Sequence, residues 1–196
     1  MKAVFIDRDG VINRDPGGWT KYNYVTRWSE FQFIPGATEA ISKLNRNGFE
    51  IIVISNQAGV NKGYFSREEL KTVTKRMLEE INKNGGRIEE VYYCIHRDED
   101  NCDCRKPKTG LLEKAAAKFG IELDKTYFIG DSEVDVVAGR RAGCKTIFVL
   151  SGKTSLGEME KWREKPDYIF NDLMGAVDWM LKKEKRRSVR ASRRGK

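Results

Sequence analysis

Two acidic residues close the first apolar segment of the chain. Residues 3–6 are apolar and are followed at once by Asp7, Arg8, Asp9 and Gly10. A short apolar run that ends at a turn signal predicts a buried strand, and ligands of open α/β sheets bind beyond the carboxyl ends of strands. Residues two apart in extended chain point to the same side, so both carboxylates could reach one ligand. Because adjacent carboxylates repel, the pair indicates a divalent cation or an acid kept protonated for catalysis; a simple turn is the alternative.

Three further polar clusters lie at the ends of predicted strands or before a predicted helix. They are Ser55 with Asn56 after residues 51–54, Asp131 with Asp135 after residues 126–129, and Arg105, Lys106, Pro107 and Lys108 before residues 111–119. Parallel strands gather their carboxyl ends along one edge of a sheet, so these clusters are expected to meet. The carboxylates suit a hard octahedral ion such as Mg²⁺, while the hydroxyl and lysine suit the oxygens of a phosphate. Helix N-capping is the alternative for Asp131 and Asp135.

Three of the four cysteines and the only histidine lie close together in the chain, as Cys94, His96, Cys102 and Cys104. Three cysteines and one histidine form a closed, tetrahedral ligand set typical of structural zinc. Disulfides are the alternative, but they are disfavoured in a cytosolic chain. We therefore predict a structural Zn²⁺ that fixes the loop before residues 105–108. Cys144 is expected to be a small buried thiol.

The remaining segments alternate between strand and helix patterns. Further strands are predicted over residues 88–95, 145–150 and 168–170. Helices are predicted between residues 35 and 48, from the Ser66–Glu69 capping box to about residue 84, after residue 132, over 156–165 and after Asp172. Repeated strand–helix–strand units favour an α/β fold, a three-layer doubly wound parallel sheet. The aromatic segment 10–34 is expected to form a flap or hairpin over the end of the first strand.

The charge of the chain is concentrated at its C-terminus. The net charge of the 196 residues is +8, and residues 182–196 hold nine Lys or Arg and one Glu, so residues 1–181 are neutral overall. We expect one domain over 1–181 and a basic, disordered, solubilising tail over 182–196; contact of the tail with nucleic acid or acidic membranes is the alternative.

No apolar run approaches the ~20 residues that cross a bilayer, and the immediate first strand leaves no room for a signal peptide. We expect a cytoplasmic monomer.

The ordered motifs resemble those of the haloacid dehalogenase (HAD) superfamily. They are Asp7-x-Asp9-Gly-Val, Ser55, Lys106 before a helix, and Gly130-Asp131-Ser-x-x-Asp135. The resemblance implies a capless HAD-like Rossmannoid fold and phosphoryl transfer, with Asp7 as nucleophile and Asp9 as general acid and base. It also implies Mg²⁺ bound by Asp7, the Asp9 carbonyl and Asp131, a phosphoryl group held by Ser55 and Lys106, and Asp135 in support.

The predicted zinc loop, residues 94–104, narrows the resemblance to two groups of phosphatases within this superfamily. Its Cys-x-His…Cys-x-Cys-Arg-Lys-Pro pattern is similar to the heptose-bisphosphate and histidinol-phosphate phosphatases, and the segments Tyr24-Val25, Phe31-Gln-Phe33 and Gly63-Tyr-Phe65 resemble the former. A sugar phosphate would then contact Asp15, Pro16, Gly17, Gly18, Ser55, Asn56, Gln57, Ala58, Arg105 and Lys106.

Some features of the sequence also fit substrates other than a heptose bisphosphate. Arg105 would recognise a second phosphate, although an ordinary surface ion pair is its alternative. The short spacer between His96 and Cys102 resembles the histidinol phosphatases, and Ser132 stands where a lysine is expected in heptose enzymes. A nucleic-acid 3′-phosphatase, or a binding module acting through the basic tail, is a further alternative that the neutral body disfavours.

Overall fold

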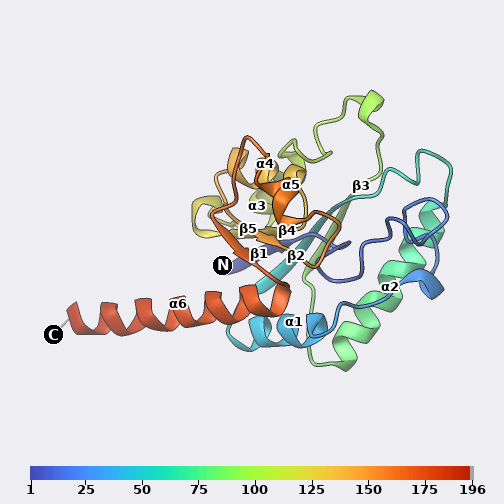
Figure 1. The fold of residues 1–196 in the computed structure, drawn as a ribbon. Coiled ribbons are helices and arrows are strands. Elements are labelled where there is room, and N and C mark those ends of the chain that lie inside the picture. Colours follow the sequence, from blue (N-terminus) through green and yellow to red (C-terminus); the bar gives the residue numbers. More distant parts are fainter. Residues whose placement is uncertain (195–196) are drawn as a thin grey trace.

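A six-stranded parallel sheet forms the centre of the protein (Figure 1). The computed structural model describes residues 1–194, with side chains through Arg186. Every neighbouring pair of strands is parallel, in the order β3-β2-β1-β4-β5-β6. The strands are β1 (Ala3–Ile6), β2 (Glu50–Asn56), β3 (Glu90–Cys94), β4 (Tyr127–Gly130), β5 (Lys145–Val149) and β6 (Tyr168–Phe170). The predicted parallel sheet is confirmed.

Helices cover both faces of the sheet. One layer holds α1 (Ala37–Arg46), α2 (Arg67–Lys83) and α6 (Leu173–Arg194), and the other holds α3 (Gly110–Phe119), α4 (Glu133–Arg141) and the short α5 (Leu156–Met159). Alternate residues of β1 show this division, since Val4 and Ile6 join the core of the first layer and Phe5 joins the core of the second. The predicted three-layer doubly wound fold is thereby confirmed.

The strand order predicts a crevice at the strand ends that carry the candidate site residues. The chain winds from β1 outward to β2 and β3, and then returns to β4 on the other side of β1. The carboxyl ends of β1, β2 and β4 therefore flank the point where the strand order reverses. Ligands bind at such a switch point in open α/β sheets.

The helix predicted over 156–165 and the hairpin alternative for segment 10–34 differ from the observed structure. The helix expected over 156–165 is only the four-residue α5, and Trp162 beyond it packs against Phe148, with ring centroids 5.1 Å apart. In the described structure, segment 10–34 forms no strand. It has a 3-10 helix at Trp28–Glu30 and isolated bridges between Asp9 and Asn13 and between Asn13 and Phe33. The aromatic rings pack against one another instead of lining up along a hairpin.

The basic C-terminal segment also differs from expectation. Helix α6 begins after Asp172, whose carboxylate accepts a hydrogen bond from the Gly175 amide at 2.8 Å, as predicted for a cap. It continues through Arg194 and projects away from the sheet (Figure 1), whereas a disordered tail was expected from residue 182. Lysine and arginine are good helix formers, and extending an existing helix needs no new nucleus. Residues 195–196 lie outside the described part.

A search of the described helices finds none that is both long and apolar enough to cross a membrane.

Candidate active site

Most of the polar groups predicted at the strand ends line one cavity of about 400 Å³, and Asp135 lies outside its wall. It lies at the carboxyl ends of β1, β2 and β4, where the crevice was expected. Residues from the predicted site on its wall are Asp7, Asp9, Asp15, Pro16, Ser55, Asn56, Arg105, Lys106 and Asp131. Segments more than a hundred residues apart in the sequence thus meet at one edge of the sheet.

Lys106 lies between two acids at the floor of this cavity. Its Nζ is 3.0 Å from Asp7 Oδ2 and 2.6 Å from Asp135 Oδ1, and it donates to the Ile54 carbonyl at 2.9 Å. Burial disfavours the charge of this side chain, which is only 3% exposed, but Asp135 and Asp7 outweigh burial and raise the pKa of Lys106 above its usual range. Lys106 is therefore a fixed cation.

The acids around Lys106 carry more negative charge than one ammonium can balance. Oxygens of Asp7, Asp131 and Asp135 lie within 4.8 Å of one another. Burial raises the pKa of Asp7 to about 6, although Lys106 opposes part of that rise. Burial, together with the charges of Asp135 and Asp7, also raises the pKa of Asp131 well above its ordinary value. A buried set of carboxylate oxygens with surplus negative charge fits a hard divalent cation such as Mg²⁺.

Two glycines make room for the Asp131 carboxylate. A Cβ atom at Gly10 would lie 2.4 Å from Asp131 Oδ2, and one at Gly152 would lie 1.9 Å from it. Gly10 also has a φ of +79°, a conformation that side chains disfavour. The segment carrying Gly152 closes over the acid, since the Lys153 amide donates to Asp131 Oδ2 at 3.3 Å and Ser151 Oγ donates to the Gly10 carbonyl at 2.7 Å.

Asp135 has a second structural role. Its Oδ2 accepts hydrogen bonds from the amide and hydroxyl of Ser132, which form a capping box at the start of α4. The capping alternative is therefore correct for Asp135, and its other oxygen still contacts Lys106. Asp131 lies just before this cap and points into the cavity.

Among the described residues, four of the predicted substrate contacts do not line the cavity: Gly17, Gly18, Gln57 and Ala58. Gly17 and Gly18 are exposed beside it, and Ala58 is buried in the core. Gln57 is fully buried, and its Nε2 donates to Asp9 Oδ2 at 2.7 Å and to Ser55 Oγ at 3.3 Å. Gln57 thus contacts the side chains of the site from behind.

Other residues on the wall were not predicted, and Lys153 and Tyr24 are among them. Lys153 follows β5, so the rule that placed polar groups at strand ends would have found it. Tyr24 comes from the irregular segment 10–34, whose path no local pattern determines.

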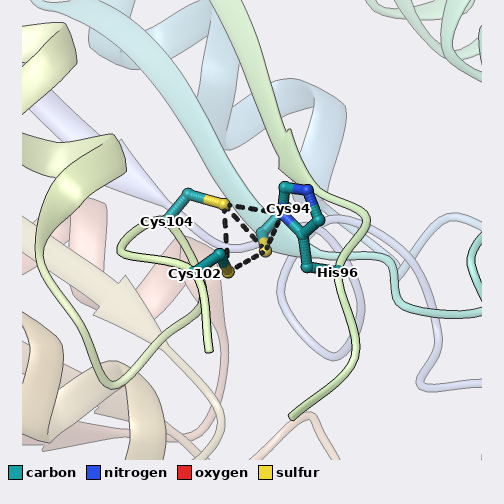
Figure 2. Close-up of side chains that lie close together, drawn as sticks. All are labelled: Cys94, His96, Cys102 and Cys104. Atoms are coloured by element: carbon teal, nitrogen blue, oxygen red, sulfur yellow. Dashed lines mark hydrogen bonds between the residues drawn. The ribbon is translucent and has the colours of Figure 1, made fainter. Parts of the chain in front are cut away.

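The four predicted zinc ligands converge at the end of β3. Figure 2 shows the side chains of Cys94, His96, Cys102 and Cys104 pointing toward one another, with sulfur and nitrogen atoms 3.1 to 3.8 Å apart. Tetrahedral bonds of about 2.3 Å to sulfur would place ligand atoms at similar separations, ~3.8 Å. All four cysteines of the chain are free, so the disulfide alternative is not observed.

The thiols of this cluster differ in their pKa values. Burial and a hydrogen bond with Cys104 raise the pKa of Cys94 above its usual range. Burial acts in the same direction on Cys102, but hydrogen bonds with Cys104 and Cys94 outweigh it and lower the pKa of Cys102 to about 7. A thiol of lowered pKa in a cluster that also contains a histidine nitrogen fits zinc, which binds the deprotonated sulfur.

The zinc loop is joined to the active-site cavity. Asn56 at the end of β2 exchanges two hydrogen bonds of 3.1 Å with the Lys106 backbone, which follows the cluster. Arg105 Nε lies 2.5 Å from Asp98 Oδ1, so the surface ion pair that was the alternative for Arg105 is formed, while Arg105 also lines the cavity. The loop that carries the cluster thereby places the side chains of Arg105 and Lys106 at the cavity.

Comparisons with known proteins agree with this geometry. A sequence model of the HAD-hydrolase-like family matches residues 103–176. A D-glycero-beta-D-manno-heptose-1,7-bisphosphate 7-phosphatase of Haemophilus ducreyi is 35% identical over 187 residues, covering 91% of this chain and 98% of that protein. The Pseudomonas putida protein of the same name is 35% identical over 175 residues, covering 88% and 95% of the two chains.

Solved structures give the same result. The D,D-heptose 1,7-bisphosphate phosphatase from B. bronchiseptica, complexed with magnesium and phosphate, has a TM-score of 0.84 at 27% identity, over 93% of this chain and 99% of that one. The corresponding enzyme from Burkholderia thailandensis has a TM-score of 0.70 at 27% identity, over 92% and 99%. The chain therefore belongs to the HAD-like hydrolases, in the family of phosphatases that contains the D-glycero-beta-D-manno-heptose-1,7-bisphosphate 7-phosphatases.

Proposed function

We propose that this protein is a Mg²⁺-dependent phosphatase that removes the C7 phosphate of D-glycero-D-manno-heptose 1,7-bisphosphate. One observation carries the proposal: Asp7 lies 3.0 Å from a buried lysine, in a cavity shared with Asp9 and Asp131, in a chain that aligns over nearly its whole length with phosphatases of that name. The substrate comes from those relatives, and the reaction type also follows from the site.

The proposed reaction has two steps. Asp7 attacks phosphorus and forms an aspartyl-phosphate, while the bond to the sugar oxygen breaks and Asp9 protonates that oxygen. Asp9 then takes a proton from water, whose oxygen attacks phosphorus, releases inorganic phosphate and restores Asp7. Ser55 and Lys106 hold the oxygens of the phosphoryl group in both steps, and Asp135 keeps Lys106 in place.

The metal ions have separate roles in this proposal. Asp7, Asp131 and the backbone carbonyl of Asp9 would hold Mg²⁺, which supplies the positive charge that lets an anionic nucleophile approach an anionic phosphate. The closed set of Cys94, His96, Cys102 and Cys104 would hold a structural Zn²⁺. Arg105 would meet the second phosphate of the sugar, with Asp15, Pro16 and Asn56 on the remaining wall.

We further propose that the protein acts in the cytoplasm as a monomer. Free thiols support a reducing compartment. Asp7, Asp9, Ser55, Lys106 and Asp131 all come from one chain and line a single cavity, so the site needs no partner subunit.

The experiment that tests the substrate compares kcat/KM on three phosphomonoesters in Mg²⁺. They are heptose 1,7-bisphosphate, histidinol phosphate and a 3′-phosphorylated oligonucleotide. We expect the first to exceed the others by at least about 10-fold, because it carries a second phosphomonoester that Arg105 can contact, and a charge-assisted contact is worth ~1.5–3 kcal/mol. A higher value on either of the others would overturn the assignment of the substrate. Asp7→Asn, expected to be inactive on all three, excludes a contaminating phosphatase.

A further inference from the structure

Arg8 is a fully buried charge that the proposed chemistry does not use. It stands between Asp7 and Asp9 in the sequence and is the largest side chain with no exposed surface. Arginine is almost never fully buried unless it is paired. Its partner is Asp9, the proposed general acid and base. Arg8 Nη2 donates to Asp9 Oδ1 at 3.0 Å and to Oδ2 at 2.9 Å, and Nε lies 3.3 Å from Oδ1.

The guanidinium of Arg8 also lies against an aromatic ring. Its central carbon lies 5.6 Å from the centre of the Tyr93 ring on β3. The Tyr93 hydroxyl lies 2.9 Å from Thr74 Oγ1 on α2, so β3 and α2 together fix the ring. The burial and the planar shape of the guanidinium leave it few alternative orientations.

Two amide side chains complete the surroundings of Asp9. Asn13 Nδ2 donates to Oδ1 at 2.8 Å, and Gln57 Nε2 donates to Oδ2 at 2.7 Å. Both residues are also anchored through their backbones, because the backbone N–H of Asn13 donates to the Arg8 carbonyl at 3.1 Å and the backbone N–H of Gln57 donates to the Cys94 carbonyl at 2.6 Å. Each oxygen of Asp9 therefore meets at least two donors, and the plane of the carboxylate is fixed.

We propose that Arg8 is a positioning residue, which orients the Asp9 carboxylate for proton transfer to the departing oxygen of the substrate. This inference rests on the proposed function, because it requires Asp9 to be the general acid. Proton transfer requires hydrogen-bond reach, and a misplacement of about 1 Å can reduce a rate ~10²-fold. The competing explanation is that Arg8 only balances charge in the core and supports the fold.

The choice of leaving group separates these explanations. An alkyl phosphate such as heptose bisphosphate releases a poor leaving group that must be protonated, whereas p-nitrophenyl phosphate releases a stable anion. The ratio kcat/KM depends on the steps up to release of the alcohol, in which Asp9 donates its proton. It does not depend on the later hydrolysis of the aspartyl-phosphate. A fold defect lowers kcat/KM on both substrates equally, but a misplaced acid lowers it mainly on the alkyl phosphate.

The decisive variant is Arg8→Lys, which keeps the charge and the aliphatic stem but loses the planar fork. We expect kcat/KM to fall at least about 10-fold on heptose bisphosphate and less than about 3-fold on p-nitrophenyl phosphate. In an Asp9→Asn background, the same substitution should change neither value by more than about 2-fold, because no acid remains to be positioned. Lys43→Met, which breaks a remote ion pair with Asp178 at 2.5 Å, is the matched control and should change neither.

The outcomes separate the inference from the proposed function. Equal losses on both substrates for Arg8→Lys, or no loss, would overturn the positioning role if Asp9→Asn still shows the selective loss. If Asp9→Asn shows no selectivity, the role of Asp9 in the proposed function fails first. Should Arg8→Lys fail to fold, as judged by circular dichroism, Tyr93→Leu removes the ring that supports Arg8. It is expected to give a smaller loss with the same selectivity, and an unselective effect would contradict the inference.

Discussion

Lys106 is the residue on which the charge balance of the site depends. Its ammonium contacts both Asp7 and Asp135, and all three side chains are buried. Removing one partner of a buried ion pair leaves an uncompensated charge, which costs about 3–5 kcal/mol. A site built in this way is sensitive to any change in the number of its charges.

The first prediction concerns this lysine. Lys106→Met is expected to lower the free energy of unfolding by about 3 kcal/mol in the absence of Mg²⁺. It should also reduce kcat at least about 10²-fold, because a preorganised charge on the phosphoryl group is lost. Urea unfolding and phosphate release measure the two effects. A variant with wild-type turnover would show that Lys106 does not contact the reacting group.

Gly10 makes space for the metal-binding acid, and this leads to a second prediction. Gly10→Ala would place a methyl group 2.4 Å from Asp131 Oδ2. We expect activity to fall at least about 10-fold and the Mg²⁺ concentration for half-maximal activity to rise, because a ~1 Å shift of a ligand is costly. Gly48→Ala is the matched control, since Gly48 has a similar φ of +77° but nothing within 4 Å of the added atom. Equal activity losses in both variants would point to backbone strain alone.

A third prediction concerns pH and the buried thiol of Cys144. Burial raises the pKa of Cys144 from 9.0 to about 12. The unfolded chain therefore loses this proton first, so the contribution of the buried thiol to stability is complete below pH 9 and is lost as the pH rises toward 12. At pH 8, iodoacetamide should label Cys144 slowly in the native protein and rapidly in guanidinium chloride, as read by mass spectrometry. Rapid native labelling would contradict the burial.

At the scale of elements, the zinc loop connects β3 to α3 and presents two cations to the cavity. Much of the loop between Cys94 and Cys104 is irregular, and the four candidate zinc ligands lie close together in it. Short irregular segments are seldom rigid without such a constraint. The metal is therefore expected to act on catalysis through the position of Arg105 and Lys106.

Removal of this metal is the fourth prediction. Cys102→Ser should lower the zinc content from one ion per chain, and it should reduce activity about 10-fold or more, because ligand loss weakens binding strongly. Elemental analysis and phosphate release measure these effects. Cys144→Ser, a cysteine outside the cluster, should retain zinc and activity. Zinc loss with full activity would show that the loop holds its position without the metal.

The elements also show how far sequence reasoning extends. The strand-end rule correctly brought Asp7, Ser55 and Asp131 together, because parallel topology alone determines where strand ends meet. The rule could not show that Arg8 would be buried, since the Tyr93 ring that it contacts comes from β3, far along the chain. The irregular segment 10–34 and the short α5 depend on tertiary packing of aromatic rings, for which no local pattern exists.

At the scale of the whole molecule, α6 combines a docked half and a projecting half. Leu173, Ala176, Val177 and Met180 are buried in the core, and Glu184 reaches back to Lys2 at 2.9 Å. The basic residues from 182 to 194 thus continue a helix that the neutral body anchors. The expected boundary of the catalytic domain near residue 181 stays a prediction.

Truncation tests whether the end of the chain belongs to the catalytic unit, as the fifth prediction. Deleting residues 187–196 should leave kcat/KM on heptose bisphosphate unchanged within about 2-fold and should change the free energy of unfolding by less than about 0.5 kcal/mol, as for surface changes. Any affinity for an anionic oligonucleotide, followed by fluorescence anisotropy, should be lost in the same variant. A large loss of turnover would place the end of the chain within the catalytic unit.

The central claim is that Asp7 is the nucleophile, and acid quenching during turnover tests it most directly. Wild-type protein, Mg²⁺ and heptose bisphosphate are mixed, quenched in acid and digested, and the peptides are analysed by mass spectrometry. The predicted result is a phosphoryl adduct on the peptide that contains Asp7, absent in Asp7→Asn, which also releases no phosphate. An adduct on a different residue, or continued turnover by Asp7→Asn, would contradict the mechanism.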